Sequence, residues 1–405
     1  MAPQPIATVP LTAPLLAQAA PPTADAAQDI LSFAVVDALF STSPDARERQ
    51  ALLTLPSQEA GPFDELTWSG EGRLAAVYNY GEVYIWNPAS ASPTQVFEST
   101  CAYLPNLSLF WANQGKTLLI QEVCDVPNSE TGDSIGLYLS DGAGPQGTRP
   151  LPGLPDDISS QLYISPDGSQ VAYVWQGNIY RLALNGARPR QVTSEPGVYG
   201  AAGSPLAWSP DGTQLAFYEG SYPFQRLNVI DADGRNRKVL TPGPNFQIYR
   251  SRIYWSPDSR SIVFFQPFDP PYGNQETLQL VNVATGEIRP LTRPGFYDAV
   301  SWSPDGQKLA LAVGEVERQS LFVLDLATET FTPLTAEPLA QVLQTLWSPS
   351  GSWLAFSGEP VGQELGNQIL YTVRPDGSDL RSHSADDEYV YPFTWQPGPV
   401  TQAAN

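Results

Sequence analysis

Apolar residues alternate with small or polar residues in short runs, and tight turns separate these runs. In residues 204–217, Leu206 and Trp208 alternate with small residues before a Ser-Pro-Asp-Gly turn, and Leu215 and Phe217 alternate after it. A period of two predicts β-strands. Proline fixes φ at the first turn position, aspartate bonds back to the backbone, and glycine accepts positive φ. The segment therefore predicts a β-hairpin.

This hairpin recurs along the whole chain, in strong and weak copies. The strong copies place their turn aspartates at Asp167, Asp211, Asp258 and Asp305, and a fifth copy has Ser350 instead. The residue before each turn is tryptophan, or isoleucine once, and the eight positions are 68, 111, 164, 208, 255, 302, 347 and 395. A period in the forties, with four strands per unit, is typical of a β-propeller. We therefore expect an all-β fold of four-stranded blades.

The two ends of the chain decide the number of blades. Residues 31–37 and 51–55 match the outer strands of the other units, while residues 391–395 match an inner strand with ten residues after it. One blade built from both ends closes the ring without an open sheet edge. We predict eight blades in a single domain over residues 29–405. The alternative is seven blades, with residues 30–40 as a capping helix.

Residues 1–28 differ in composition from the rest of the chain. They are rich in alanine and proline, carry no charge before Asp25, and show no periodicity. We predict a disordered leader. Residues 11–20 are similar to the end of a secretory signal, but a basic region is missing and prolines interrupt the apolar run. A degenerate export signal and a plain flexible arm both fit, and no stretch approaches the ~18 apolar residues of a membrane span.

Charge and cysteine content narrow the class of protein. The formal net charge is −21, from 42 acidic and 21 basic residues. Such a surface repels phosphate backbones, so we expect no nucleic-acid partner, although solubility alone explains the charge. Folding the chain about residues 113–115 brings Cys124 close to Cys101. A disulfide and two separate buried thiols both fit this geometry. No cysteine or histidine spacing indicates zinc.

The residues give catalysis little support. The turn aspartates stand one per blade, too far apart to share a proton or a cation, so turn formation explains them. The single histidine, His383, lies in a polar stretch without a visible nucleophile and carboxylate beside it. No Gly-x-Ser-x-Gly elbow, phosphate-binding glycine loop or dinucleotide fingerprint is present. We therefore expect no enzyme activity, no cofactor and no metal.

Binding residues are expected in the longer loops between the second and third strands of each blade. Two of these loops carry aromatic residues beside acids, and they belong to neighbouring units. The candidate protein-binding residues are Tyr222, Phe224, Phe268, Asp269 and Tyr272. Exposed aromatic anchors with a polar surround are typical of interface cores. The alternative is that these rings fold back on their own loops.

The Trp-Ser-Pro-Asp-Gly turn, the Leu-Ala-Phe strand after it and the later Leu-Thr pair resemble the TolB-type (PD40) family of propeller repeats. The resemblance covers residues 30–397, although the small α/β domain that precedes the propeller in TolB is missing. It implies a non-catalytic scaffold, periplasmic or at a bacterial cell surface, that binds a protein partner. Two alternatives remain open: binding of a small molecule or glycan at the channel mouth, and a metal-dependent lactonase or hydrolase.

Overall fold

The computed structural model describes most of the chain from residue 29 onward. The described residues are 29–35, 38–45, 49–54, 62–87, 92–101, 105–112, 115–124, 134–155, 158, 162–186, 188–194, 206–220, 225–241, 252–268, 275–315, 318–362, 368–384 and 390–397. The predicted leader, residues 1–28, lies outside this part of the chain.

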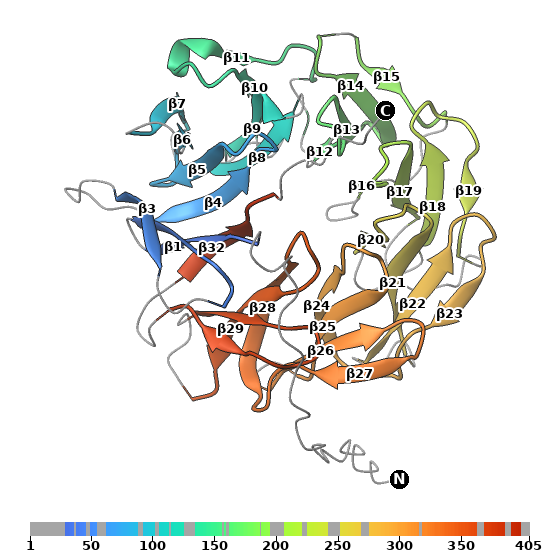
Figure 1. The fold of residues 1–405 in the computed structure, drawn as a ribbon. Coiled ribbons are helices and arrows are strands. Elements are labelled where there is room, and N and C mark those ends of the chain that lie inside the picture. The colour runs from blue at the N-terminus through green and yellow to red at the C-terminus, as the bar shows by residue number, and fades with distance from the viewer. Residues whose placement is uncertain are drawn as a thin grey trace, which may run out of the picture.

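The described residues form eight four-stranded antiparallel sheets, which are arranged as blades around a ring (Figure 1). We number the blades along the chain. Blade 1 contains β4 (Phe63–Trp68), β5 (Leu74–Tyr78), β6 (Glu82–Trp86) and β7 (Thr94–Glu98). Blade 2 contains β8 (Asn106–Ala112), β9 (Thr117–Cys124), β10 (Ser134–Ser140), the 3-10 helix η3 (Pro145–Gly147) and β11 (Thr148–Pro150). Blade 3 contains β12 (Tyr163–Ile164), β13 (Gln170–Trp175), β14 (Asn178–Ala183) and β15 (Arg190–Gln191).

The remaining blades follow the same order from the inner to the outer strand. Blade 4 contains β16 (Leu206–Trp208), β17 (Gln214–Glu219), β18 (Arg226–Asp231) and β19 (Lys238–Val239). Blade 5 contains β20 (Tyr254–Trp255), β21 (Ser261–Pro267), β22 (Glu276–Asn282) and β23 (Ile288–Pro290). Blade 6 contains β24 (Tyr297–Trp302), β25 (Lys308–Val313), β26 (Ser320–Asp325) and β27 (Thr330–Pro333). Blade 7 contains β28 (Leu339–Trp347), β29 (Leu354–Pro360), β30 (Ile369–Val373) and β31 (Arg381–Ser382).

Blade 8 is built from both ends of the chain and confirms the eight-bladed ring. Its strands are β32 (Val390–Trp395), β1 (Leu31–Val35), β2 (Ala38–Thr42) and β3 (Gln50–Thr54). The seven-blade alternative is wrong, because residues 31–35 and 38–42, where it placed a capping helix, form the strands β1 and β2. The assignment of residues 31–37 to one outer strand is also wrong. The chain reverses after Val35, which pairs with Ala38, so the N-terminal end supplies three strands and β1 pairs directly with β32.

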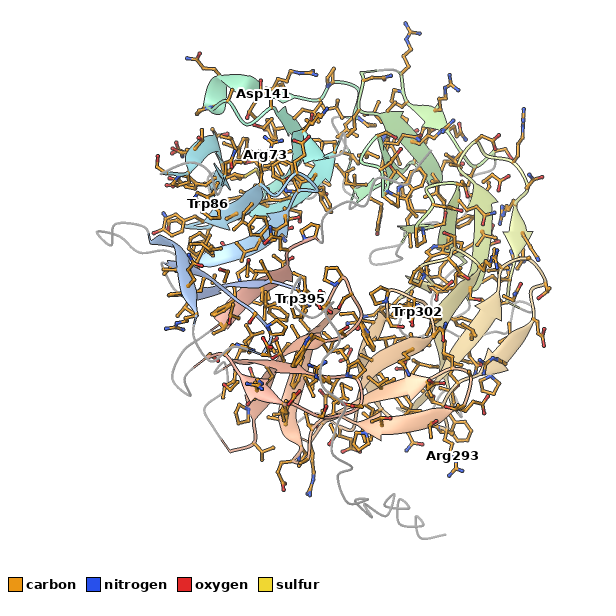
Figure 2. All side chains as sticks on the ribbon, in the orientation of Figure 1. Arg73, Trp86, Asp141, Arg293, Trp302 and Trp395 are labelled. Atoms are coloured by element: carbon orange, nitrogen blue, oxygen red, sulfur yellow. A yellow bond between two sulfur atoms is a disulfide. The ribbon has the colours of Figure 1, made fainter. Side chains whose placement is uncertain are left out.

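The tryptophans that end the inner strands join each blade to the one before it. Six of them donate the indole N–H to a backbone carbonyl in the preceding inner strand, at 2.9 to 3.2 Å: Trp111, Trp208, Trp255, Trp302, Trp347 and Trp395. Trp68 donates instead to Ser32 Oγ of blade 8, at 3.1 Å. Figure 2 shows Trp302 and Trp395 on the inner side of the ring. Ile164 has no such donor, so the joint between blades 2 and 3 differs from the others.

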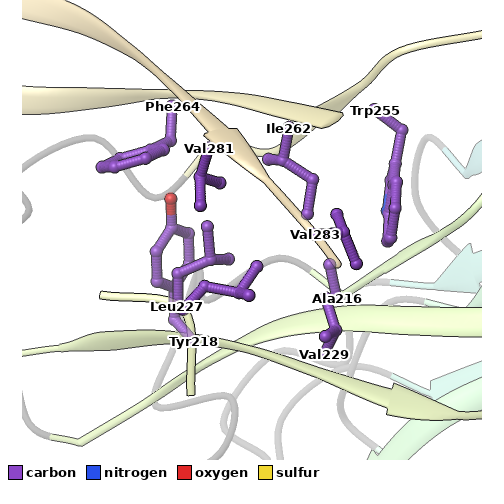
Figure 3. Packing of buried hydrophobic residues seen from close by; sticks show 10 residues of the cluster. Ala216, Tyr218, Leu227, Val229, Trp255, Ile262, Phe264, Val281 and Val283 are labelled. Atoms are coloured by element: carbon purple, nitrogen blue, oxygen red, sulfur yellow. The ribbon is translucent and has the colours of Figure 1, made fainter. Parts of the chain in front are cut away.

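The apolar core lies between neighbouring blades. Between blades 4 and 5, Tyr218 and Leu227 pack against Phe264 and Val281, and all four side chains are buried (Figure 3). The Tyr218 hydroxyl donates a hydrogen bond to the Arg252 carbonyl at 3.2 Å. Because both faces of a blade are covered in this way, its central strands are apolar on both sides, which the sequence shows as runs such as Leu-Ala-Phe.

The Ser-Pro-Asp turns have the same geometry in four blades, and the residue after the aspartate is glycine in three of them and Ser259, at a φ of 60°, in blade 5. In blade 4, Ser209 Oγ donates to Asp211 Oδ1 at 2.6 Å, and the Thr213 N–H donates to the same oxygen at 3.0 Å. Gly212 has a φ of 70°, which favours glycine at this position. In blade 5 the hydrogen bond from Ser256 lowers the pKa of Asp258. These contacts support the interpretation that each of the four aspartates stabilises its own turn.

Candidate functional site

The ring has two faces with different connections. The connections between the first and second strands of each blade, including the Ser-Pro-Asp-Gly turns, lie on one face, which we call the turn face. The connections between second and third strands lie on the other face, which we call the loop face. Four of the five predicted binding residues, Tyr222, Phe224, Asp269 and Tyr272, lie outside the described residues. The fifth, Phe268, follows β21 on the loop face and is 49% exposed.

A different set of residues, which we call the Asp64 cluster, gathers on the loop face of blades 1 and 8. It consists of Asp64, Glu65, Tyr80 and Tyr391. Asp64 is the extra residue of a β-bulge, because Phe63 pairs with Tyr78 and Glu65 with Val77. Bulges re-aim side chains and are common beside functional sites. The Asp64 carboxylate accepts a hydrogen bond from the backbone N–H of Tyr80, while its Oδ2 atom is buried without a partner.

Tyr80 and Tyr391 supply the aromatic part of the Asp64 cluster. Tyr80 occupies the turn between β5 and β6 at a φ of 61°, an unusual conformation for a bulky side chain, and is 41% exposed. Tyr391 lies at the start of the inner strand β32 and is also 41% exposed. Burial of its hydroxyl, together with the nearby charges of Glu65 and Asp64, raises the pKa of Tyr391. The cluster thus combines two carboxyl groups with two exposed rings.

Glu65 is the second acid of the Asp64 cluster and is partly buried. Its carboxylate accepts a hydrogen bond from the backbone N–H of Leu109, on the inner strand of blade 2, at 3.1 Å. Burial raises the pKa of Glu65 to about 7. The hydrogen bond from Leu109 has the opposite effect and lowers this pKa, but burial is the larger cause. Burial disfavours the charged form of the Glu65 carboxyl group. A cation bound nearby would favour that charged form. Groups with such shifts are frequent at functional sites, although structural networks also produce them.

His383 lies in a structural network at the joint of blades 7 and 8. Its Nε2 atom is 2.7 Å from Thr372 Oγ1, which in turn donates to the Pro44 carbonyl at 2.8 Å. Because the threonine hydroxyl has one proton, His383 donates to it through Nε2. Burial, together with the nearby Arg381 charge, lowers the pKa of His383 to about 4. The imidazole is therefore neutral at pH 7 and ties the N-terminal strands to blade 7.

Glu65 and His383 give stability opposite dependences on pH. Folded Glu65 holds its proton up to about pH 7, so its contribution to the free energy of unfolding falls as pH rises from 4.5 to 7. Folded His383 stays unprotonated down to about pH 4, so its contribution rises with pH from 4 to 6.5. Each amounts to ~2 kcal/mol between pH 4.5 and 6.5. We expect Glu65→Gln to make stability rise with pH relative to the unmodified chain, and His383→Gln to make it fall.

Urea unfolding at a series of pH values measures these slopes. The Glu65→Gln variant keeps a side-chain acceptor for the Leu109 N–H. The slope of its stability against pH therefore reports the loss of the titrating group and not the loss of this hydrogen bond. If stability changes with pH by the same slope in the unmodified chain and in both variants, the assigned protonation states are contradicted.

The two cysteines are joined by a disulfide on the loop-face side of blade 2. The Cα atoms of Cys101 and Cys124 are 5.6 Å apart, which fits the predicted hairpin register. Glu122 lies beside the disulfide and accepts hydrogen bonds from Ser99 and Tyr138. Among the described residues, these three side chains form the one group of metal-ligating atoms within 4.8 Å of one another. The two sulfurs are bonded to each other, so this group serves as a cross-link.

This architecture defines the class of protein: an eight-bladed β-propeller closed by strands from both chain ends. Residues 220–399 match the family model described as the TolB beta propeller domain, PD40. This match covers the C-terminal part of the chain, and the turns and strand patterns of the chain resemble the same family of propeller repeats. Its sequence has no significant match among proteins of curated function.

Solved structures with the same fold differ in activity. An oligogalacturonate lyase in complex with manganese is 14% identical, with a TM-score of 0.56, over 85% of this chain and 96% of the lyase. Porphyromonas gingivalis dipeptidyl peptidase 4 is 12% identical, with a TM-score of 0.57, over 84% of this chain and 57% of the peptidase. TolB from Acinetobacter baumannii is 16% identical, with a TM-score of 0.43, over 83% of this chain and 82% of TolB. At these identities the similarity to the lyase and the peptidase, whose TM-scores exceed 0.5, is one of fold, and function has to be argued from the site.

Sequence reasoning missed the Asp64 cluster. Its members are spread over residues 64 to 391, and only closure of the ring brings Tyr391 next to Asp64 and Glu65. One signal was present, because Asp64 and Glu65 form an acidic pair inside a predicted strand, where charged residues are uncommon. Separately, no helix among the described residues is long and apolar enough to cross a membrane.

Proposed function

We propose that this chain is a non-catalytic scaffold that binds a protein partner through its loop face. The observation that carries the proposal is the placement of exposed aromatic residues. Of the four exposed aromatic side chains among the described residues, Tyr80, Phe268 and Tyr391 lie on the loop face, and Phe331 lies on an outer strand. Aromatic residues beside polar groups are enriched in the cores of protein interfaces.

The chemistry of the partner follows from the Asp64 cluster. Two carboxyl groups between two tyrosine rings favour a lysine or arginine side chain, through ion pairing and cation–π attraction. The net charge of −21 adds a long-range attraction for a basic surface. The partner is therefore a protein that presents a basic segment, and association weakens as salt is added.

The place of action is the periplasm or the bacterial cell surface. The disulfide between Cys101 and Cys124 supports this part of the proposal, because such bonds persist in oxidising compartments. The neutral, structurally bonded His383 supports a non-catalytic role, since it is the single histidine of the chain and is engaged between two blades.

Capture of the partner tests the proposal. The immobilised chain is incubated with a bacterial envelope extract at low salt, and bound proteins are compared with those held by a Tyr80→Ser/Tyr391→Ser variant. We expect at least a tenfold loss of one specific basic protein, since interface anchors contribute ~2 kcal/mol or more each. The matched control is Phe331→Ser, which removes an equally exposed ring from the outer strand β27.

Thermal melts of all three proteins exclude a folding defect. Equal capture by the unmodified chain and the tyrosine variant, or loss of capture with Phe331→Ser, would contradict binding through the loop face.

A further inference from the structure

The joint between blades 2 and 3 departs from the repeat in two ways. Ile164 replaces the tryptophan, and the interval from Trp111 to Ile164 is 53 residues, against 43 to 48 elsewhere. Gly153, Leu154 and Pro155, in the connection from β11 to β12, line a pocket against blade 3. The pocket therefore lies at the joint where the tryptophan is missing.

Aromatic rings of blade 3 form the opposite wall of this pocket. Tyr173 and Trp175 come from β13 and Tyr180 from β14, and Pro189 completes the lining. The rings of Tyr173 and Tyr180 are stacked with centroids 5.8 Å apart, and Trp175 meets Tyr180 edge-on at 5.4 Å. The pocket has a volume of about 460 Å³, within the range of small-molecule sites. None of its lining side chains is charged.

One polar atom in this wall has no partner. The Tyr173 side chain is fully buried, and its hydroxyl forms no hydrogen bond. A buried hydroxyl without a partner destabilises the folded chain, so a fold rarely retains one without a use for it. The Tyr180 hydroxyl, in contrast, contacts Gln191. The pocket thus offers stacking surface, and its wall contains a buried hydrogen-bond donor that has no partner in the fold.

We propose that this pocket binds a small, uncharged molecule with flat rings and one hydrogen-bond acceptor. The ring faces stack on Tyr180 and Trp175, and the acceptor takes the proton of the Tyr173 hydroxyl. A cavity of about 150 Å³ holds benzene, so this larger pocket accommodates two fused rings. The site is separate from the Asp64 cluster, because it lies between blades 2 and 3 and involves no residue of that cluster.

Coumarin, an uncharged bicyclic compound with a carbonyl acceptor, is the probe, and naphthalene is the matched probe without an acceptor. Ligand-observed saturation-transfer NMR on the full chain gives the dissociation constants. We expect Tyr173→Phe to weaken coumarin binding about fivefold to tenfold and to leave naphthalene unchanged. Trp175→Ala should weaken both probes, because it removes part of the wall.

Tyr218→Phe is the control, since it removes a buried hydroxyl that has a partner outside the pocket. Tyr218→Phe should lower the melting temperature without affecting coumarin, whereas Tyr173→Phe should leave the melting temperature unchanged or raise it. Any one of three results would overturn the proposal. Tyr173→Phe could leave coumarin binding unchanged, or it could lose as much stability as Tyr218→Phe does. The third result is that the chain binds an octaproline peptide and does not bind coumarin.

Discussion

Deletion of residues 29–56 is expected to leave a chain that no longer unfolds cooperatively. These residues supply three of the four strands of blade 8. Leu31, Phe33 and Leu39 are almost completely buried, and Ser32 accepts the indole hydrogen bond of Trp68. Burial of such side chains contributes ~2–3 kcal/mol each, and their sum approaches the ~5–15 kcal/mol that stabilises a whole domain. Without them β32 also has an open edge.

Thermal unfolding followed by circular dichroism measures this effect. Deletion of residues 1–28 is the control, because it keeps the contacts of Asp29 with Ser350 and of Pro44 with Thr372. This control should melt like the full chain. If the chain without residues 29–56 also melts at the same temperature, ring closure by both ends is refuted.

Removal of the disulfide is expected to cost about 3 kcal/mol of unfolding free energy. Cys101 and Cys124 are separated by 23 positions, and a cross-link over a loop of this length restricts the unfolded chain by roughly that amount. Urea unfolding of the Cys101→Ala/Cys124→Ala variant measures the loss. The unmodified chain in the presence of a reductant should show a similar loss. Equal stability of the oxidised and reduced chains would show that the bond does not form in solution.

The repeated hairpin made most of the fold predictable from sequence. Each copy combines a period-two apolar pattern with a turn whose residues specify its backbone, so propensity and packing agree at the same positions. The tryptophans marked seven of the eight inner strands correctly because each also donates a hydrogen bond to the preceding blade. The N-terminal strands were harder to assign, because the apolar run of residues 31–37 contains no turn residue such as glycine or proline to mark the reversal after Val35.

The candidate sites were less predictable for a physical reason. The candidate binding residues lie where the repeat is interrupted, so periodicity carries no information about their contacts. Asp64 is placed by a bulge, and Tyr391 reaches it only after the two ends of the chain have met. At the blade 2–3 joint, the long interval and Ile164 marked an irregularity, but only the folded chain shows that Tyr173 is left without a hydrogen-bond partner there.

Hydrogen–deuterium exchange with the captured partner tests the central claim, binding through the loop face, most directly. We expect protection of backbone amides in residues 63–65, 78–82 and 390–391, which surround the Asp64 cluster. The Ser-Pro-Asp-Gly turns at residues 165–169, 209–213 and 303–307 lie on the turn face and should exchange as in the free chain. Protection of those turns, with unchanged exchange around Tyr80 and Tyr391, would contradict the account.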